Sequence, residues 1–113
     1  LAGWTLHPDY PVIARTAALT SDMIMTQPVV YEFKDIVVPT LLIIGTRDRT
    51  AIGKDRAPKE IQPKMGQYDK LGRETQRLIP KSKLVELKGV GHMPHIEAFD
   101  SFITSLLKFL NEK

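Results

Sequence analysis

The sequence predicts an α/β fold class with two parallel strands, a crossover between them and C-terminal helices. Residues 40–44 form a continuously apolar run between Pro39 and Gly45, as expected for a parallel strand covered on both faces. A second short apolar run, residues 84–87, precedes a glycine-rich turn. Apolar residues at helical spacing lie between the two runs and again at the end of the chain, which completes the order strand, helix, strand, helix.

The segment before the first strand predicts one helix and one extended stretch. Apolar residues at loose helical spacing favour a helix over residues 12–25, and Pro28 ends it. Residues 29–34 are then expected to be a short extended stretch, and residues 35–39 to lead into the strand. Residues 1–11 are expected to be irregular because they contain two prolines.

The link after the first strand, residues 46–67, is long and rich in charge, which is typical of a functional or mobile connection. The next predicted helix spans residues 68–79, with its apolar side chains mostly on one side. Gly72 lowers the helical propensity of this segment, and Pro80 ends the helix.

The last predicted helix spans residues 98–110 and carries a stripe of apolar residues at spacings of three and four. The members of the stripe are Phe99, Phe102, Ile103, Leu106, Leu107 and Leu110. Two strands alone make a marginal sheet. We therefore expect further strands from other sequence, or a homodimer formed through the exposed sheet edge.

Composition narrows the classes of function. The 113 residues are 42% hydrophobic and 26% charged, which is ordinary for a soluble globular domain. No run approaches the roughly 18 apolar residues of a membrane-spanning helix, so no membrane partner is expected. The absence of cysteine excludes disulfides and thiolate chemistry but leaves the localisation unknown, with cytoplasm and periplasm both open.

The net charge of +3 comes from the middle of the chain, since residues 45–81 hold ten Lys or Arg and five Asp or Glu. A basic nucleic-acid surface is one interpretation. A solvated helix and loop face is favoured, because Tyr68 is the only aromatic residue that could stack on a base there. No nucleic-acid partner is expected.

Two residues could carry chemistry. Asp48 lies three residues beyond Gly45, and His92 follows Gly91, so each comes just after a predicted strand. Ligands of open α/β sheets bind beyond the carboxyl ends of the strands. If the strands are neighbours, the carboxylate can reach the imidazole, fix its tautomer and stabilise its protonated form, so that the ring acts as a general base. A Gly-x-Ser-x-Gly nucleophile motif is missing from the sequence.

Residues 38–50, with the sequence VPTLLIIGTRDRT, and residues 89–97, with the sequence GVGHMPHIE, resemble the C-terminal part of the α/β-hydrolase fold. The resemblance implies that Asp48 is the triad acid and His92 the base of an esterase-like enzyme with a small-molecule substrate. It implies that residues 1–34 end a cap-like region and that residues 35–113 are the C-terminal part of the core. No cofactor and no metal are implied.

The nucleophile and the oxyanion hole of the family lie upstream of these motifs. The chain alone is therefore expected to be inactive, and its first residue, Leu1, is consistent with a piece of a longer polypeptide. Residues upstream would also decide whether the reaction is that of an esterase, a dehalogenase, an epoxide hydrolase or a carbon–carbon hydrolase. Residues 53–67 resemble an insertion relative to the shorter link usual in the family.

Other interpretations of the same residues remain open. Asp48 alone could cap a turn. His95 is a competing base, although Pro94 before it favours packing at the start of the last helix. A metal site of His92, His95 and Glu97 is disfavoured because Pro94 interrupts the helical spacing that two such ligands need.

The basic side chains near Asp48 also have two interpretations. Arg47, Arg49 and Arg56 could hold an anionic substrate, but solvated loop charges are the favoured interpretation. At the level of the whole chain, the alternative to an enzyme portion is a non-catalytic dimerising or binding module with a hydrolase-like half-fold.

Overall fold

The computed structural model of the chain, which describes residues 6–112, falls into two units, Leu1–Tyr31 and Glu32–Lys113. The first unit contains α2, Tyr10–Thr26, in which Pro11 occupies the first turn. This element confirms the predicted helix over residues 12–25. It begins at Tyr10, so the expectation of irregular backbone is wrong for residues 10 and 11, and residues 1–5 lie outside the described residues. No residue of α2 is buried. Whether residues 1–34 end a cap-like region stays a prediction.

The prediction of an extended stretch over residues 29–34 is wrong. Residues Val29–Asp35 form the 3-10 helix η1. An extended segment needs a partner strand for its backbone groups, and the one sheet within residues 6–112 holds only two other segments. A 3-10 helix satisfies its backbone groups locally, through bonds between residues three apart.

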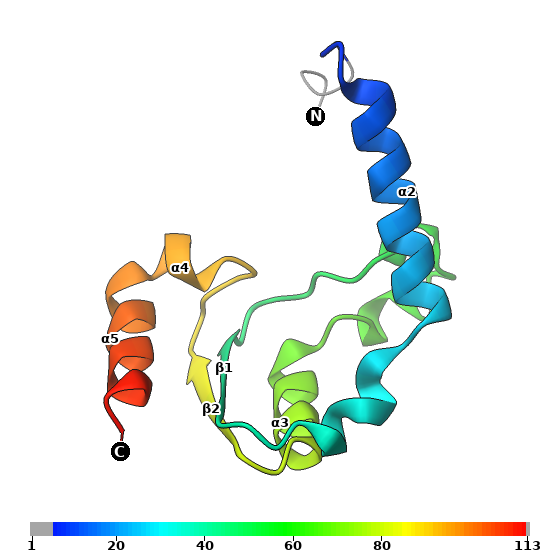
Figure 1. Ribbon diagram of the computed structural model, residues 1–113. Helices are drawn as coiled ribbons and strands as arrows, with labels where there is room; N and C mark the ends of the chain where they lie inside the picture. Colours follow the sequence, from blue (N-terminus) through cyan, green and yellow to red (C-terminus); the bar gives the residue numbers. More distant parts are fainter. Residues whose placement is uncertain (1–5, 113) are drawn as a thin grey trace. The chain divides into compact units, whose positions relative to one another are not determined.

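The second unit is built on a two-stranded parallel sheet (Figure 1). Strand β1 is Thr40–Gly45 and β2 is Ser82–Leu87, paired in register from Thr40 opposite Ser82 to Gly45 opposite Leu87. Helix α3, Tyr68–Leu78, connects the two strands. The short helix α4, Pro94–Glu97, and then α5, Phe99–Leu110, follow β2. Figure 1 shows the sheet between α3 and α5, so the predicted order of elements is confirmed.

Helix α3 packs against the sheet at a glycine. A Cβ atom on Gly72 would lie 2.9 Å from Cγ1 of Ile44, closer than real Cβ contacts. Gly72 therefore lets the helix backbone approach β1, whereas the sequence indicated only a loss of helical propensity. Ile79, which directly follows the helix, is 4% exposed and belongs to the small apolar core.

Helix α5 buries its apolar stripe only in part. Phe102, Ile103 and Leu106 are half-buried, whereas Phe99, Leu107 and Leu110 are exposed. Such a stripe is typical of a buried face, and here only half of its residues are half-buried. The reason is the small area that a two-stranded sheet offers to a helix of twelve residues.

The long link between β1 and α3 contains two single-turn 3-10 helices, η2, Lys54–Arg56, and η3, Gln62–Lys64. Within residues 6–112, no helix combines the length and apolar character needed to cross a membrane.

Candidate active site

The site lies where the two parallel strands end. Backbone hydrogen bonds join the segments that leave them: the Thr46 N–H donates to the Leu87 carbonyl, and the Arg47 N–H donates to the Val90 carbonyl, both at 3.0 Å. Because β1 and β2 are parallel and in register, these segments leave the sheet at the same edge. The residues after them, Asp48 and His92, are thereby brought together.

Asp48 and His92 are in hydrogen-bond contact. Oδ2 of Asp48 lies 2.8 Å from Nδ1 of His92. Asp48 is 6% exposed, whereas the His92 side chain is 54% exposed. An ionised carboxylate can only accept, so the proton of a neutral imidazole lies on Nδ1 and the lone pair on Nε2. The arrangement leaves a half-exposed ring with a free basic nitrogen.

Hydrogen bonds keep Asp48 ionised. Burial alone raises the pKa of this carboxyl, but the bonds from His92 and Thr50 outweigh it and hold the pKa below its ordinary value. The Thr50 backbone N–H donates to Oδ1 at 2.8 Å, so both carboxylate oxygens have a donor. Sequence reasoning did not anticipate Thr50, although an Asp that accepts from the N–H two residues later is a common turn.

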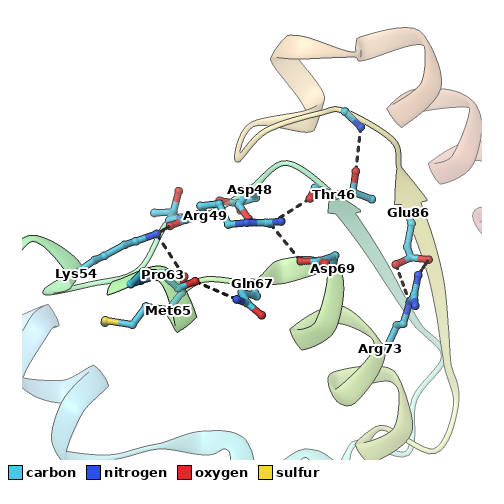
Figure 2. Close-up of polar contacts among 12 residues, drawn as sticks. Thr46, Asp48, Arg49, Lys54, Pro63, Met65, Gln67, Asp69, Arg73 and Glu86 are labelled. Carbon is cyan, nitrogen blue, oxygen red and sulfur yellow. Dashed lines mark hydrogen bonds and ion pairs between the residues drawn. The ribbon is translucent and has the colours of Figure 1, made fainter. Parts of the chain in front are cut away.

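Hydrogen bonds join the long link to the acid turn, the segment after β1 that carries Asp48 (Figure 2). The Arg49 guanidinium donates to the carbonyls of Thr46 and Asp48 and lies 3.2 Å from Oδ1 of Asp69. Nζ of Lys54 donates to the Arg49 carbonyl at 2.9 Å. These contacts give Arg49 a structural role, and they do not test the interpretation that it holds an anionic substrate.

Tyr68, at the start of α3, also reaches the site. Its ring meets the His92 ring edge-on, with centroids 6.3 Å apart and planes at 63°. Tyr68 was predicted as part of the α3 helix and had no expected role at the histidine. Its position follows from the course of the link, which the sequence pattern does not specify.

The competing base lies elsewhere. The His95 ring packs against Phe102 of α5, with centroids 5.9 Å apart. Arg47 bonds to Glu97 and to the Gly89 carbonyl, so its guanidinium also has partners within the protein. Among residues 6–112, no group of three or more His, Asp or Glu side chains is placed to hold a metal ion.

Among the comparisons with known proteins, the one with solved structures finds a similar enzyme. The sequence matches no protein-family model and no curated protein. A crystal structure of a probable hydrolytic enzyme from Pseudomonas aeruginosa PAO1 is similar to 94% of this chain, with 46% sequence identity and a TM-score of 0.89. The chain has the C-terminal part of an α/β-hydrolase fold. This hydrolase-fold chain spans 34% of the length of that enzyme. The predicted fold class and the resemblance are confirmed.

Proposed function

We propose that Asp48 and His92 are the acid and the base of a serine-type, esterase-like catalytic triad, in a hydrolase whose nucleophile lies on another segment. One observation carries the proposal: a nearly buried carboxylate contacts Nδ1 of a half-exposed imidazole at the carboxyl ends of two adjoining parallel strands. The similarity to a hydrolytic enzyme supports the reaction class.

The geometry suits a proton relay. A serine hydroxyl beside Nε2 of His92 would donate to that nitrogen while its oxygen attacks the ester carbonyl. The imidazolium that forms keeps its proton on Nδ1 and donates it in a hydrogen bond to the Asp48 carboxylate, which stabilises the positive charge. His92 then returns the first proton to the leaving alcohol, and a water molecule repeats the cycle to release the acid.

Three of the four serines of this chain have hydroxyls bonded to backbone carbonyls, which supports an external nucleophile. The hydroxyl of Ser82 donates to the carbonyls of Gln76 and Ile79, and the hydroxyl of Ser105 donates to a carbonyl of its own helix. Ser21 does the same within α2. None of these lies in a Gly-x-Ser-x-Gly sequence, which the chain lacks.

A chimera tests the proposal. The matched segment of the Pseudomonas enzyme is replaced by this chain, and hydrolysis of p-nitrophenyl acetate and labelling by a fluorophosphonate are measured. We expect activity in the chimera, and losses of about 10³- to 10⁴-fold in kcat for H92Q and D48N. H95Q is the matched control and should stay within a few-fold of the parent. A folded chimera in which H92Q keeps full activity contradicts the proposal.

The isolated chain provides the complementary test. It should not react with the fluorophosphonate, because no activated serine is expected in it. Stoichiometric labelling of a single serine would mean that the nucleophile lies within these residues, contrary to the proposal.

A second function, a non-catalytic dimerising module, is supported by the free edges of the two-stranded sheet and by the many exposed apolar side chains. An unpaired strand edge can pair with a second copy. Solution size decides between the two. A stable dimer that unfolds cooperatively, together with an inactive chimera, would favour the module over the enzyme portion.

A further inference from the structure

Two charged side chains, Arg47 and Glu97, bond to backbone groups of the turn that precedes His92. Nε of Arg47 donates to the Gly89 carbonyl at 2.8 Å, and its Nη2 forms an ion pair with Oε1 of Glu97. Oε2 of Glu97 accepts the Gly91 N–H at 2.8 Å. One side chain follows β1 and the other ends α4, so the two strands and the short helix are joined through this turn.

Further contacts hold the same turn. The Gly89 N–H donates to Oγ1 of Thr46 at 2.9 Å, a bond drawn in Figure 2. A Cβ atom on Gly91 would lie 2.8 Å from Oε2 of Glu97, so a larger residue there would require this carboxylate to shift. Gly89 has a φ of 75°, which glycine adopts without steric cost. The Gly89 carbonyl, the Gly89 N–H and the Gly91 N–H thus each bond to a side chain from outside the turn.

We propose that Arg47 and Glu97 are positioning residues that set the His92 ring against Asp48. The inference rests on the proposed function. Arg47 directly precedes Asp48, and the Gly91 N–H held by Glu97 belongs to the residue before His92. The ion pair therefore joins the neighbours of both members of the acid–base pair. A displacement of the turn would move the His92 ring relative to the carboxylate that it contacts.

Because the Arg47–Glu97 pair is exposed, a positioning role can be distinguished from a contribution to folding stability. The Arg47 and Glu97 side chains are 63% and 39% exposed, and such surface ion pairs add little to folding free energy. A second Arg–Glu pair provides a matched control: Nε and Nη2 of Arg73 in α3 lie 3.0 and 3.1 Å from the Glu86 carboxylate in β2 (Figure 2). That pair lies away from the turn.

The first test measures the His92 Nδ1–H directly. In the 113-residue chain labelled with ¹⁵N, the hydrogen-bonded imidazole proton is observed by NMR. We expect E97A and R47K to shift this resonance and to speed its exchange with water, because lysine cannot bond Gly89 and Glu97 in the way that the guanidinium does. E97Q should show a smaller change, since its amide oxygen can still accept from Gly91. E86Q and R73K should leave the resonance unchanged.

The second test measures catalysis in the chimera described above. We expect E97A to lower kcat by about 10- to 100-fold with little change in KM, because a misplaced base slows the reaction without weakening substrate binding. If E97A fails to fold, E97Q and R47K provide the same comparison with smaller effects.

The outcomes separate the two proposals. If E97A, E97Q and R47K match the E86Q control in both the resonance and kcat while H92Q is inactive, only the positioning role is overturned. If H92Q itself stays active, the proposed function falls first.

Discussion

The Asp48 carboxylate lies 2.8 Å from Nδ1 of His92, although 44 positions separate the two residues in the sequence. The contact follows from strand register, because Gly45 at the end of β1 pairs with Leu87 at the end of β2. Each strand then leaves the sheet through a short turn, and the two turns are bonded to each other through Thr46 and Arg47. The acid–base pair therefore depends on how closely those turns can approach.

Gly45 sets that approach, and Gly45→Ala should disrupt it. A Cβ atom there would lie 2.2 Å from the Gly91 carbonyl oxygen and 2.4 Å from the Val90 oxygen. Backbone cannot yield as a side chain can, so the His92 turn has to move away. We expect a loss of about 1–3 kcal/mol in the free energy of unfolding, measured by urea denaturation, and loss of the His92 Nδ1–H resonance.

Gly72→Ala is the comparison for that variant. Its new methyl group would meet the Ile44 side chain at 2.9 Å, at the α3 contact and not at the turn. We expect it to lower stability while leaving the His92 resonance in place. A Gly45→Ala chain with unchanged His92 resonances would show that the turn does not depend on this approach.

The lowered pKa of Asp48 predicts a pH dependence of stability. Because the folded state holds this carboxyl below its ordinary pKa of about 3.9, it favours the ionised form. The resulting stabilisation is complete above the ordinary pKa and is lost as the pH falls through the folded-state pKa. The difference in unfolding free energy between the wild type and D48N should therefore be largest near neutral pH and shrink in acid.

Urea denaturation of both chains at a series of pH values measures this difference. D55N removes an exposed carboxylate in η2 and serves as the control, which we expect to follow the wild-type curve. A difference between the wild type and D48N that grows on acidification would contradict the assigned direction of the shift.

Alanine substitutions at two glycines of the link, which have similar φ angles, distinguish the effect of backbone strain from that of close packing. Gly53 has a φ of 73° and open space where a Cβ atom would lie, whereas Gly66 has a φ of 66° and would place a Cβ 2.6 Å from the carbonyl oxygens of Arg49 and Thr50. Gly53→Ala should cost about 1 kcal/mol in unfolding free energy, from strain alone. Gly66→Ala should cost at least about 2 kcal/mol, since the clash adds to the strain.

The same pair of variants tests whether the link supports the acid. Displacing Arg49 and Thr50 should weaken the Thr50 N–H bond to Asp48, so Gly66→Ala should speed amide exchange at Thr50 and Gly53→Ala should not. Equal destabilisation by the two substitutions would mean that Gly66 does not pack closely against the backbone of Arg49 and Thr50.

The features predictable from sequence are those with a local cause. The apolar run that became β1 lies between a proline and a glycine, and the glycines before His92 permit one sharp turn, so these elements could be placed without knowing the fold. The extended assignment of residues 29–34 failed because a strand requires a partner that the pattern does not contain.

The features missed by sequence reasoning depend on the path of the chain in space. Gly72 looks like a weak helix position, and only its approach to Ile44 explains it. Arg47 and Glu97 look like a loop charge and a metal-ligand candidate, because nothing local indicates that they meet across the His92 turn. The contact of Tyr68 with His92 likewise requires the course of a link of more than twenty residues.

That aromatic contact leads to the last prediction. The Tyr68 ring lies edge-on to the His92 ring, so replacing it should change both the magnetic environment of the imidazole and its packing. Tyr68→Leu should move the carbon-bound proton resonances of His92 and cost about 0.5–1.5 kcal/mol in unfolding free energy, whereas Tyr68→Phe keeps the ring and should do neither.

The His95–Phe102 pair is the matched control, since its rings are 5.9 Å apart and lie in α4 and α5. Phe102→Leu should move the resonances of His95 and leave those of His92 in place. If Tyr68→Leu leaves His92 unchanged while Phe102→Leu moves His95, the Tyr68 ring does not pack against the imidazole. If both behave as expected, the Tyr68 ring at the start of α3 contacts the base and is part of the site.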